Sequence, residues 1–197
     1  MKGILAALIL FTACAQAEPG YYVIGDSQCE AVMKYDEIQQ KWTGGGDASL
    51  SWPHKIQTFT GMYMKNACRS GQLVASGAVY NTIVALDIVP NGSIRGIIVH
   101  LGTNDKVRTE IYGAPLDFGE ELSRGVQEAL SRGLEVICIL PPDNFWFTTE
   151  DVRAIVSANC PVTIDGSAIV GPADMPDGSH FGPEGHRAYA EGIMEGL

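Results

Sequence analysis

Tyr21-Tyr22-Val23-Ile24-Gly25-Asp26-Ser27 is the stretch from which the fold class follows. Its four apolar residues end directly at Gly25, which predicts a buried strand that enters a loop. Similar apolar runs occur at residues 94–101 and 134–140, and each is followed by glycine or proline. Near-continuous apolar strands separated by helices are typical of a parallel sheet covered on both faces. We therefore predict a three-layer α/β/α domain with about five parallel strands.

The other elements follow from the spacing of apolar residues. Val32, Tyr35, Ile38 and Trp42, for example, recur at helical spacing and predict a helix from Ser27 to Trp42. In open α/β sheets, ligands bind outside the carboxyl ends of the strands, so reactive residues should directly follow strands. The predicted strands span residues 21–24, 62–67, 94–101, 134–140 and 161–164, and the predicted helices span 27–42, 52–59, 73–88, 118–132, 149–159 and 183–197.

Length and charge limit the classes of function. The chain has 197 residues and a mass of 21.1 kDa, which suits one domain with a substantial core. It carries 13 basic and 23 acidic side chains, a formal charge of −10. Nucleic acids and anionic membrane surfaces are bound by clustered lysine and arginine, so we expect neither as the main partner. The oligomeric state does not follow from the sequence.

The N-terminus has the layout of a secretory signal peptide. Met1-Lys2 precedes an apolar run at residues 4–13, and Ala15-Gln16-Ala17 provides a cleavage site. The run is shorter than the roughly 20 residues that span a bilayer. We therefore expect residues 1–17 to be removed and residues 18–197 to form one exported domain, periplasmic or extracellular. The alternatives are a first core element and a lipoprotein anchored through Cys14.

Export changes the charge and the cysteine count. Loss of Lys2 leaves 12 basic against 23 acidic side chains, a charge of −11. Four cysteines remain, Cys29, Cys68, Cys138 and Cys160, in a compartment that permits disulfides. They allow three pairings, and spacing does not choose among them; four buried apolar cysteines are the other interpretation. Their spacing contains no CxxC, so a zinc site is not expected.

Four loops that follow predicted strands or precede the last helix carry candidate reactive groups. Ser27 follows the first strand, where it is either a nucleophile or a helix cap. The loop at residues 66–71 ends in Gly71, whose backbone N–H is available to a reaction centre or simply completes a turn. Asn104 follows the apolar strand 94–101, and its amide is either an oxyanion donor or a cap. Asp177 lies three residues before His180, so its carboxylate can orient the imidazole ring.

Taken in order, these loops resemble the four sequence blocks of the SGNH hydrolases, also called the GDSL esterase/lipase superfamily. The resemblance covers residues 21–197 and implies a flavodoxin-like α/β/α sandwich and hydrolysis of carboxylic esters. It implies Ser27 as nucleophile, His180 as general base and Asp177 as its orienting acid. The oxyanion hole would consist of the backbone N–H groups of Ser27 and Gly71 and the side chain of Asn104. This chemistry needs no metal or organic cofactor.

The chain departs from the family pattern directly after the nucleophile. The first block usually continues with leucine, whereas this sequence continues with Gln28-Cys29-Glu30-Ala31. The departure concerns the acyl side of the pocket rather than the nucleophile. Because Cys29 and Cys68 both lie in loops of the implied active site, our hypothesis is that they form a disulfide. Cys138 would then pair with Cys160.

Several other residues are expected to have supporting roles. Asp26 and Asp105 flank the implied site and should hold loops through backbone hydrogen bonds. His100 is expected to pack inside the domain, whereas His54 and His186 are expected on the surface. The aromatic run Phe145-Trp146-Phe147 either forms a substrate-binding wall or packs over the core.

The substrate stays open among several classes. An acetylated carbohydrate is the first expectation, and a short-chain lipid or aryl ester is the second. An acyltransferase that passes an acetyl group to an exported polysaccharide would carry the same motifs, and a non-catalytic binding module on the same fold is a more remote alternative. A flavin-binding protein is disfavoured because residues 25–28 are not a phosphate-binding loop. The α/β-hydrolase fold is disfavoured because the chain has no G-x-S-x-G motif.

Overall fold

A five-stranded parallel sheet forms the centre of the computed structural model, which describes residues 18–30, 34–36, 41–43 and 46–197. The strand order is β4-β1-β5-β6-β7, and every neighbouring pair is parallel. Counted along the sheet, this is the 2-1-3-4-5 order of flavodoxin-like folds. The strands are β1 (Gly20–Gly25), β4 (Met64–Asn66), β5 (Ile94–His100), β6 (Glu135–Leu140) and β7 (Thr163–Asp165).

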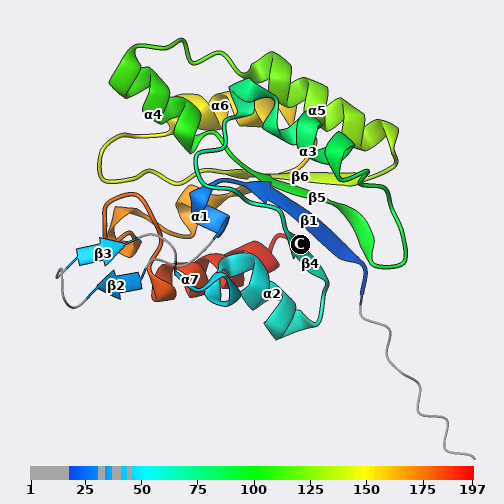
Figure 1. The fold of residues 1–197 in the computed structure, drawn as a ribbon, viewed down its shortest axis with the longest axis horizontal. Helices are drawn as coiled ribbons and strands as arrows, with labels where there is room; N and C mark the ends of the chain where they lie inside the picture. Colours follow the sequence, from blue (N-terminus) through cyan, green and yellow to red (C-terminus); the bar gives the residue numbers. More distant parts are fainter. Residues whose placement is uncertain (1–17, 31–33, 37–40, 44–45) are drawn as a thin grey trace, which may run out of the picture.

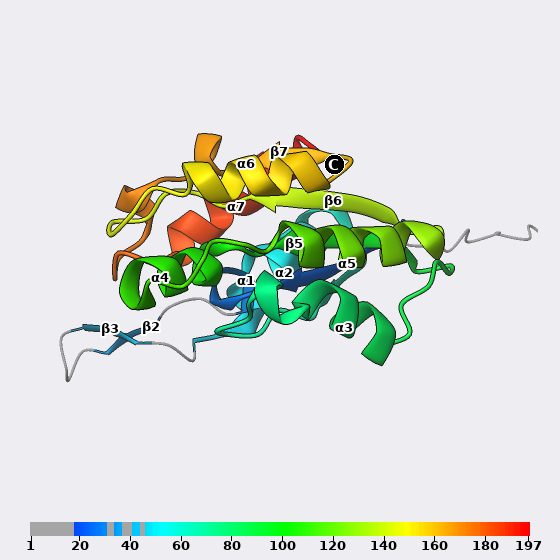
Figure 2. The same cartoon turned by 90° about the horizontal axis from the view of Figure 1, so that it is seen from above.

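Helices cover both faces of this sheet, as Figures 1 and 2 show. One face carries α3 (Ala78–Ala85), α4 (Thr103–Tyr112), α5 (Gly119–Ser131) and α6 (Glu150–Asn159). The other face carries α2 (Trp52–Thr60) and α7 (Pro183–Met194), which pack on each other. The predicted three-layer α/β/α fold with five strands is confirmed.

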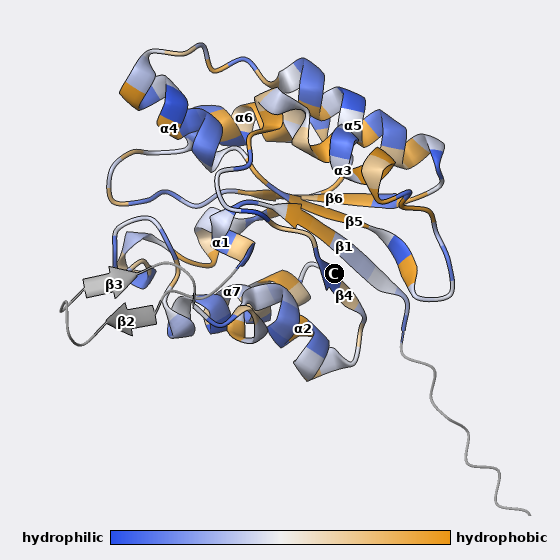
Figure 3. Cartoon of the chain, viewed as in Figure 1, coloured by the Kyte–Doolittle hydropathy of each residue, from blue (hydrophilic) through white to orange (hydrophobic). Residues whose placement is uncertain are grey.

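Two apolar cores lie on the two faces of the sheet because successive side chains of a strand point to opposite sides. In β5, Ile97 and Val99 join the core under α3 and α5, whereas Ile98 joins the core under α2 and α7. In β6, Val136 and Ile137 divide in the same way. Figure 3 shows the resulting concentration of apolar residues on the strands. Both faces of β1, β5 and β6 are therefore apolar, which explains the near-continuous apolar runs in the sequence.

The predicted helix from Ser27 to Trp42 is wrong. Helix α1 is a single turn, Ser27–Glu30, and it is followed by the strands β2 (Lys34–Asp36) and β3 (Lys41–Thr43). These strands form an antiparallel pair in which Tyr35 and Trp42 are register partners. Aromatic residues favour strands, so the spacing that suggests a helix is equally compatible with this pair. Val32 and Ile38 lie outside the described residues.

Two further helices differ from expectation. The predicted helix at residues 73–88 is divided into a 3-10 turn (Val74–Ser76) and α3, because Gly77 between them has φ = 73°. Helix α4 was not predicted, since its buried positions are the polar residues Thr103, Asp105 and Lys106. A polar buried face leaves no apolar periodicity to detect. No described helix has the length and apolar composition needed to cross a membrane.

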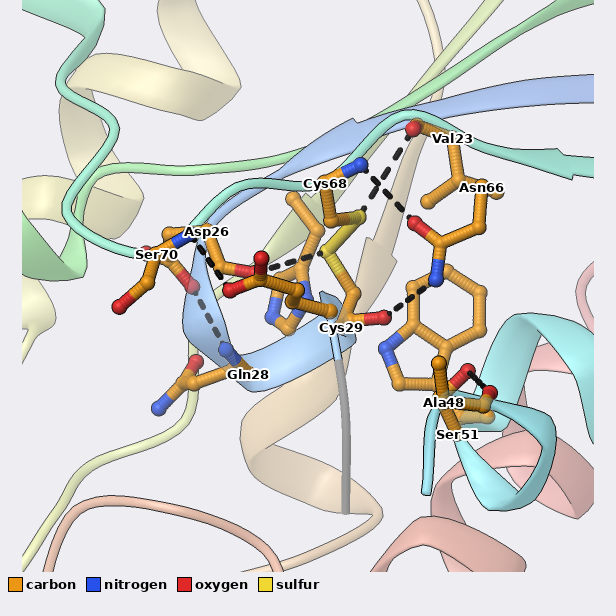
Figure 4. The surroundings of a disulfide bond; sticks show 12 residues. Val23, Asp26, Gln28, Cys29, Ala48, Ser51, Asn66, Cys68 and Ser70 are labelled. Atoms are coloured by element: carbon orange, nitrogen blue, oxygen red, sulfur yellow. Dashed lines mark hydrogen bonds between the residues drawn. A yellow bond between two sulfur atoms is a disulfide. The ribbon is translucent and has the colours of Figure 1, made fainter. Parts of the chain in front are cut away.

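Two disulfides join distant parts of the chain. Cys29 in α1 is bonded to Cys68, which follows β4, and Cys138 in β6 is bonded to Cys160 at the end of α6. Figure 4 shows the first of these bonds. Both pairs are those named in the sequence hypothesis. The expected signal peptide and Cys14 lie outside the described residues.

Removal of either disulfide should lower stability. The bonded cysteines are separated by 39 and 22 residues. The chain-entropy model therefore predicts a loss of about 4 kcal/mol for C29A/C68A and about 3 kcal/mol for C138A/C160A. Urea unfolding of the two double variants and the wild type measures both losses. Unchanged free energies of unfolding would contradict a stabilising role for these bonds.

Candidate active site

Ser27 and His180 come together although 153 residues separate them in the sequence. Ser27 begins α1, directly after β1, and His180 lies in the loop that precedes α7. The Ser27 Oγ atom is 2.8 Å from His180 Nε2. In Figure 1, α1 and the orange loop before α7 lie at the same end of the sheet. The site is therefore at the carboxyl end of the strands, as the fold class predicts.

Asp177 fixes the orientation of the His180 ring. The ring nitrogen Nδ1 is 2.7 Å from Asp177 Oδ2, and Asp177 Oδ1 accepts the backbone N–H groups of Ser179 and His180 at 2.9 and 2.7 Å. A carboxylate only accepts hydrogen bonds, so Nδ1 must carry the proton and donate it. Nε2 is then an acceptor for the Ser27 hydroxyl. The side chains of His180 and Asp177 are 33% and 25% exposed, so the pair is open to small molecules.

The same hydrogen bonds control the ionisation of Asp177. Partial burial acts to raise the pKa of this carboxyl, but the hydrogen bonds from His180 and Ser179 outweigh that effect and lower the pKa below its ordinary value. Asp177 is therefore ionised at neutral pH. An ionised carboxylate beside Nδ1 stabilises an imidazolium when the ring accepts a second proton.

Gln28 is a site residue that the sequence analysis missed. Its side chain is buried and lies next to the nucleophile in the chain. Its Nε2 donates to the Ser179 carbonyl at 3.2 Å, and its Oε1 accepts from the Thr103 hydroxyl at 3.4 Å. Gln28 thus connects α1 with the histidine loop and with the start of α4. The only available signal was its polar character at a position where the family pattern has leucine.

Asn104 lies between two of the predicted loops. It is the second residue of α4, and its Nδ2 donates to the Gln72 carbonyl at 3.1 Å and to Asp26 Oδ2 at 3.4 Å. These contacts join the start of α4 to the loop that carries Gly71 and to the residue that precedes Ser27. Asn104 therefore connects the loop of Gly71 with the loop of Ser27.

Gly71 is joined to the site through its chain neighbours. It lies in an exposed turn with φ = 74°, a conformation that favours glycine. On one side, the Ser70 N–H donates to Glu30 of α1 at 2.7 Å. On the other side, the Gln72 carbonyl accepts from Asn104. The turn is therefore held between α1 and α4.

The disulfide Cys29–Cys68 braces this turn against the nucleophile loop. Figure 4 shows the side chain of Asn66 bridging the two cysteines. Asn66 Nδ2 donates to the Cys29 carbonyl at 2.7 Å, and its Oδ1 accepts the Cys68 N–H at 2.9 Å. The Arg69 N–H also donates to the Gly25 carbonyl at 2.9 Å. The disulfide and two hydrogen bonds, from Asn66 to the Cys29 carbonyl and from Arg69 to the Gly25 carbonyl, thus join the loops of Ser27 and Gly71.

Two buried carboxyls hold the loops, as expected. Asp105 accepts the backbone N–H groups of Val74 and Ala75, both at 2.9 Å. Asp26 accepts the Gln28 N–H at 3.0 Å. Burial raises the pKa of both carboxyls, and for Asp26 the value reaches about 7 despite the Gln28 hydrogen bond and the nearby His180.

The burial of the other three histidines agrees with the prediction for two of them and differs for the third. His100 is buried as expected; its Nε2 is 3.1 Å from the Tyr189 hydroxyl, and burial lowers its pKa to about 3. His54 is exposed, also as expected. The expectation of a surface His186 is wrong, because α7 turns this side chain toward α2, where its Nδ1 accepts the Trp52 N–H at 3.1 Å.

The structure separates the two interpretations of the aromatic run. Phe145 and Trp146 are 70% and 68% exposed, so these two rings do not pack over the core. They lie in the loop between β6 and α6, and the Phe145 N–H donates to the Gly178 carbonyl at 2.9 Å. Gly178 belongs to the loop of Asp177 and His180. The aromatic pair is therefore attached to the loop that carries the histidine.

Neither a protein-family model nor a curated protein matches the sequence. Solved structures do match. A carbohydrate acetylesterase from Sinorhizobium meliloti superposes with a TM-score of 0.71 at 13% identity, covering 90% of this chain and 97% of that chain. A member of the lipolytic protein G-D-S-L family from Veillonella parvula gives 0.66 at 18% identity, covering 89% and 96%. An acetylxylan esterase from Geobacillus stearothermophilus gives 0.61 at 15% identity, covering 92% and 95%.

These similarities extend over nearly the whole of each compared chain. At this level of identity they establish a common fold. The chain therefore has the three-layer α/β/α fold of the G-D-S-L, or SGNH, esterases, which is the fold that the sequence resemblance implies.

The buried carboxyl of Asp26 leads to a prediction about stability. Its pKa of about 7 in the folded chain lies above its ordinary value of 3.8, so the folded state holds the proton more tightly than the unfolded state. Between about pH 4 and pH 7 the folded chain then binds more protons, and the free energy of unfolding falls as pH rises through this window. Asp26→Asn removes the titration.

Urea unfolding of wild type and Asp26→Asn at several pH values measures this effect. From pH 4 to pH 8, the wild type should lose on the order of 4 kcal/mol of stability relative to the variant. Asp105, His180 and Tyr189, which interact electrostatically with Asp26, are present in both proteins. A stability difference that does not change with pH would contradict the raised pKa.

Proposed function

We propose that the chain is an exported serine esterase of the SGNH superfamily that hydrolyses short-chain carboxylic esters. The observation that carries this proposal is the hydrogen-bonded series Ser27–His180–Asp177, with distances of 2.8 and 2.7 Å. A hydroxyl aligned on an imidazole that is itself oriented by a carboxylate is the arrangement of an activated nucleophile. The fold supports the same conclusion, because the solved structures that share it include esterases.

In the proposed reaction, the oxygen of Ser27 attacks the carbonyl carbon of the ester while His180 Nε2 takes the hydroxyl proton. The ring becomes an imidazolium, which the ionised Asp177 stabilises. As the tetrahedral intermediate collapses, the bond to the alcohol oxygen breaks and His180 returns the proton to the leaving alcohol. Water, deprotonated by His180, then attacks the acyl-Ser27 ester and releases the acid.

The oxyanion of the intermediate would be held by the backbone N–H groups of Ser27 and Gly71 and by the Asn104 amide. Asn104 donates to Gln72 at 3.1 Å and, less closely, to Asp26 at 3.4 Å. The shorter bond keeps the amide in place, and the longer one is the easier to exchange for a substrate oxygen. Preset donors of this kind lower the barrier because they need no reorganisation during the reaction.

We further propose that the acyl group is acetyl and that the ester belongs to a carbohydrate. The structural neighbours include a carbohydrate acetylesterase and an acetylxylan esterase, which supports this class of substrate. The two disulfides support export, since such bonds persist mainly in oxidising compartments. Removal of residues 1–17 as a signal peptide remains part of the proposal.

Hydrolysis of p-nitrophenyl acetate tests the proposed nucleophile and base. Ser27→Ala and His180→Ala should each lower kcat by about 10⁴-fold or more. Ser131→Ala is the matched control, because Ser131 is exposed on α5 and its hydroxyl donates to the Glu128 carbonyl of the same helix at 2.8 Å. The control should keep the wild-type rate. A folded Ser27→Ala variant that retains most of the activity would contradict the proposal.

Asn104→Ala tests the oxyanion hole separately. Loss of one donor should lower kcat by roughly 10²–10³-fold with little change in KM, because the donor acts mainly in the transition state. Steady-state kinetics on p-nitrophenyl acetate measures both constants. A rise in KM at constant kcat would instead assign Asn104 to ground-state binding.

A further inference from the structure

We propose that Phe145 and Trp146 form an aromatic platform that binds a neutral sugar ring of the ester substrate beside the catalytic serine. This inference rests on the proposed function, since it assumes that Ser27 cleaves an ester. It adds the residues that select a saccharide as the alcohol part of that ester. Three features of the β6–α6 loop carry it.

The first feature is the exposure of the two rings. Phe145 and Trp146 are 70% and 68% exposed and contact each other edge-to-face, with centroids 5.2 Å apart. Water in contact with large apolar surfaces is costly, so a contiguous exposed aromatic pair is an indication of a binding surface. The pair contributes little to the core, because most of its surface remains in solvent.

The second feature is the attachment of the pair to the catalytic loop. The Phe145 N–H donates to the Gly178 carbonyl, and a Cβ atom at Gly178 would lie 3.0 Å from Trp146 Nε1 and 3.1 Å from Phe145 Cβ. The aromatic residues therefore lie directly against the backbone of Gly178. Gly178 is two residues from His180, so its Cα is at most about 7.6 Å from that of His180. The platform is thus next to the histidine that faces Ser27.

The third feature is the preorganisation of the loop. The buried Asn144 accepts the Trp146 and Phe147 N–H groups through its Oδ1 at 2.8 and 3.0 Å. The Asp143 Oδ1 accepts from the Thr149 N–H at 2.7 Å and from Arg153 at 2.8 Å. These bonds fix the backbone of the loop through contacts within the protein itself. A platform that is already ordered loses little conformational entropy when it binds.

The chemistry of the surface favours a neutral sugar over a fatty acyl chain or an anionic lipid. A pyranose ring has a face of C–H groups that stacks on an open aromatic ring while its hydroxyls stay in water. A long acyl chain gains most from an enclosed apolar groove, whereas these two rings are largely open to solvent. The formal charge of −10 also disfavours an anionic partner.

Two substrates with the same acyl group test the platform. Trp146→Ala and Phe145→Ala should lower kcat/KM on acetylated xylo-oligosaccharides about tenfold, mainly through KM, because an aromatic contact of ordinary strength is lost. Both variants should keep kcat/KM on ethyl acetate within about twofold, since its ethyl group offers no ring to stack on the platform. Trp146→Phe should restore much of the activity on the saccharide. Circular dichroism and thermal melting verify that each variant folds.

Phe59→Ala is the matched control. Phe59 is 51% exposed, and α2 leads into the start of β4, so Phe59 lies at the opposite end of the sheet from Ser27. Its loss should change neither substrate's kcat/KM. An equal loss on both substrates in Trp146→Ala, or no loss on either, would overturn the platform.

Three other results would distinguish a failure of the platform from a failure of the proposed function. A wild type that hydrolyses p-nitrophenyl acetate but not the saccharide would overturn the platform and leave the proposed function standing. A loss in Trp146→Ala that appears only with p-nitrophenyl palmitate would assign the rings to an acyl chain and also overturn it. A folded wild type that hydrolyses none of these esters would instead overturn the proposed function.

Discussion

The hydrogen bond from His180 Nδ1 to Asp177 is the interaction on which the candidate site depends. The carboxylate accepts from the ring and from two backbone N–H groups of its own loop, so one short turn fixes the position, rotation and tautomer of the imidazole. Only this tautomer leaves Nε2 free to accept the Ser27 proton. The four-residue segment from Asp177 to His180 is therefore a complete acid–histidine unit, and the rest of the fold has to bring Ser27 to it.

The parallel sheet and a buried polar network bring Ser27 there. All five strands end at the same edge of the sheet, so the segments that follow them meet. Their relative positions are then set by buried polar side chains: Gln28 connects to the histidine loop, and Asp105 connects α4 to the segment after Gly71. The disulfide Cys29–Cys68 adds a covalent connection. Removing one partner from such a network leaves another buried polar group unsatisfied, which is costly.

Sequence patterns were sufficient for the sheet and for the order of the candidate residues. The apolar runs are near-continuous because both strand faces are buried, and Ser27, Asp177 and His180 stand in recognisable loops. Sequence patterns did not predict α4 or the role of Gln28, because the buried side chains there are polar and hydrogen-bonded. Such side chains leave no apolar periodicity in the sequence. The predicted exposure of His186 was wrong for the same reason. Its ring is buried because it accepts a hydrogen bond from the backbone of α2, a tertiary contact. The exposure of Phe145 and Trp146 likewise depends on tertiary structure, namely on the position of the β6–α6 loop in the folded chain.

The central claim is that His180 activates Ser27 as a nucleophile. Treatment with a fluorophosphonate, followed by intact mass measurement and peptide mapping, tests this most directly, because the reagent reacts with activated serines and requires no knowledge of the natural substrate. We expect a single adduct on Ser27 in the wild type and its loss in a folded His180→Ala variant. An adduct on another residue, or none on a folded wild type, would show that His180 does not activate Ser27.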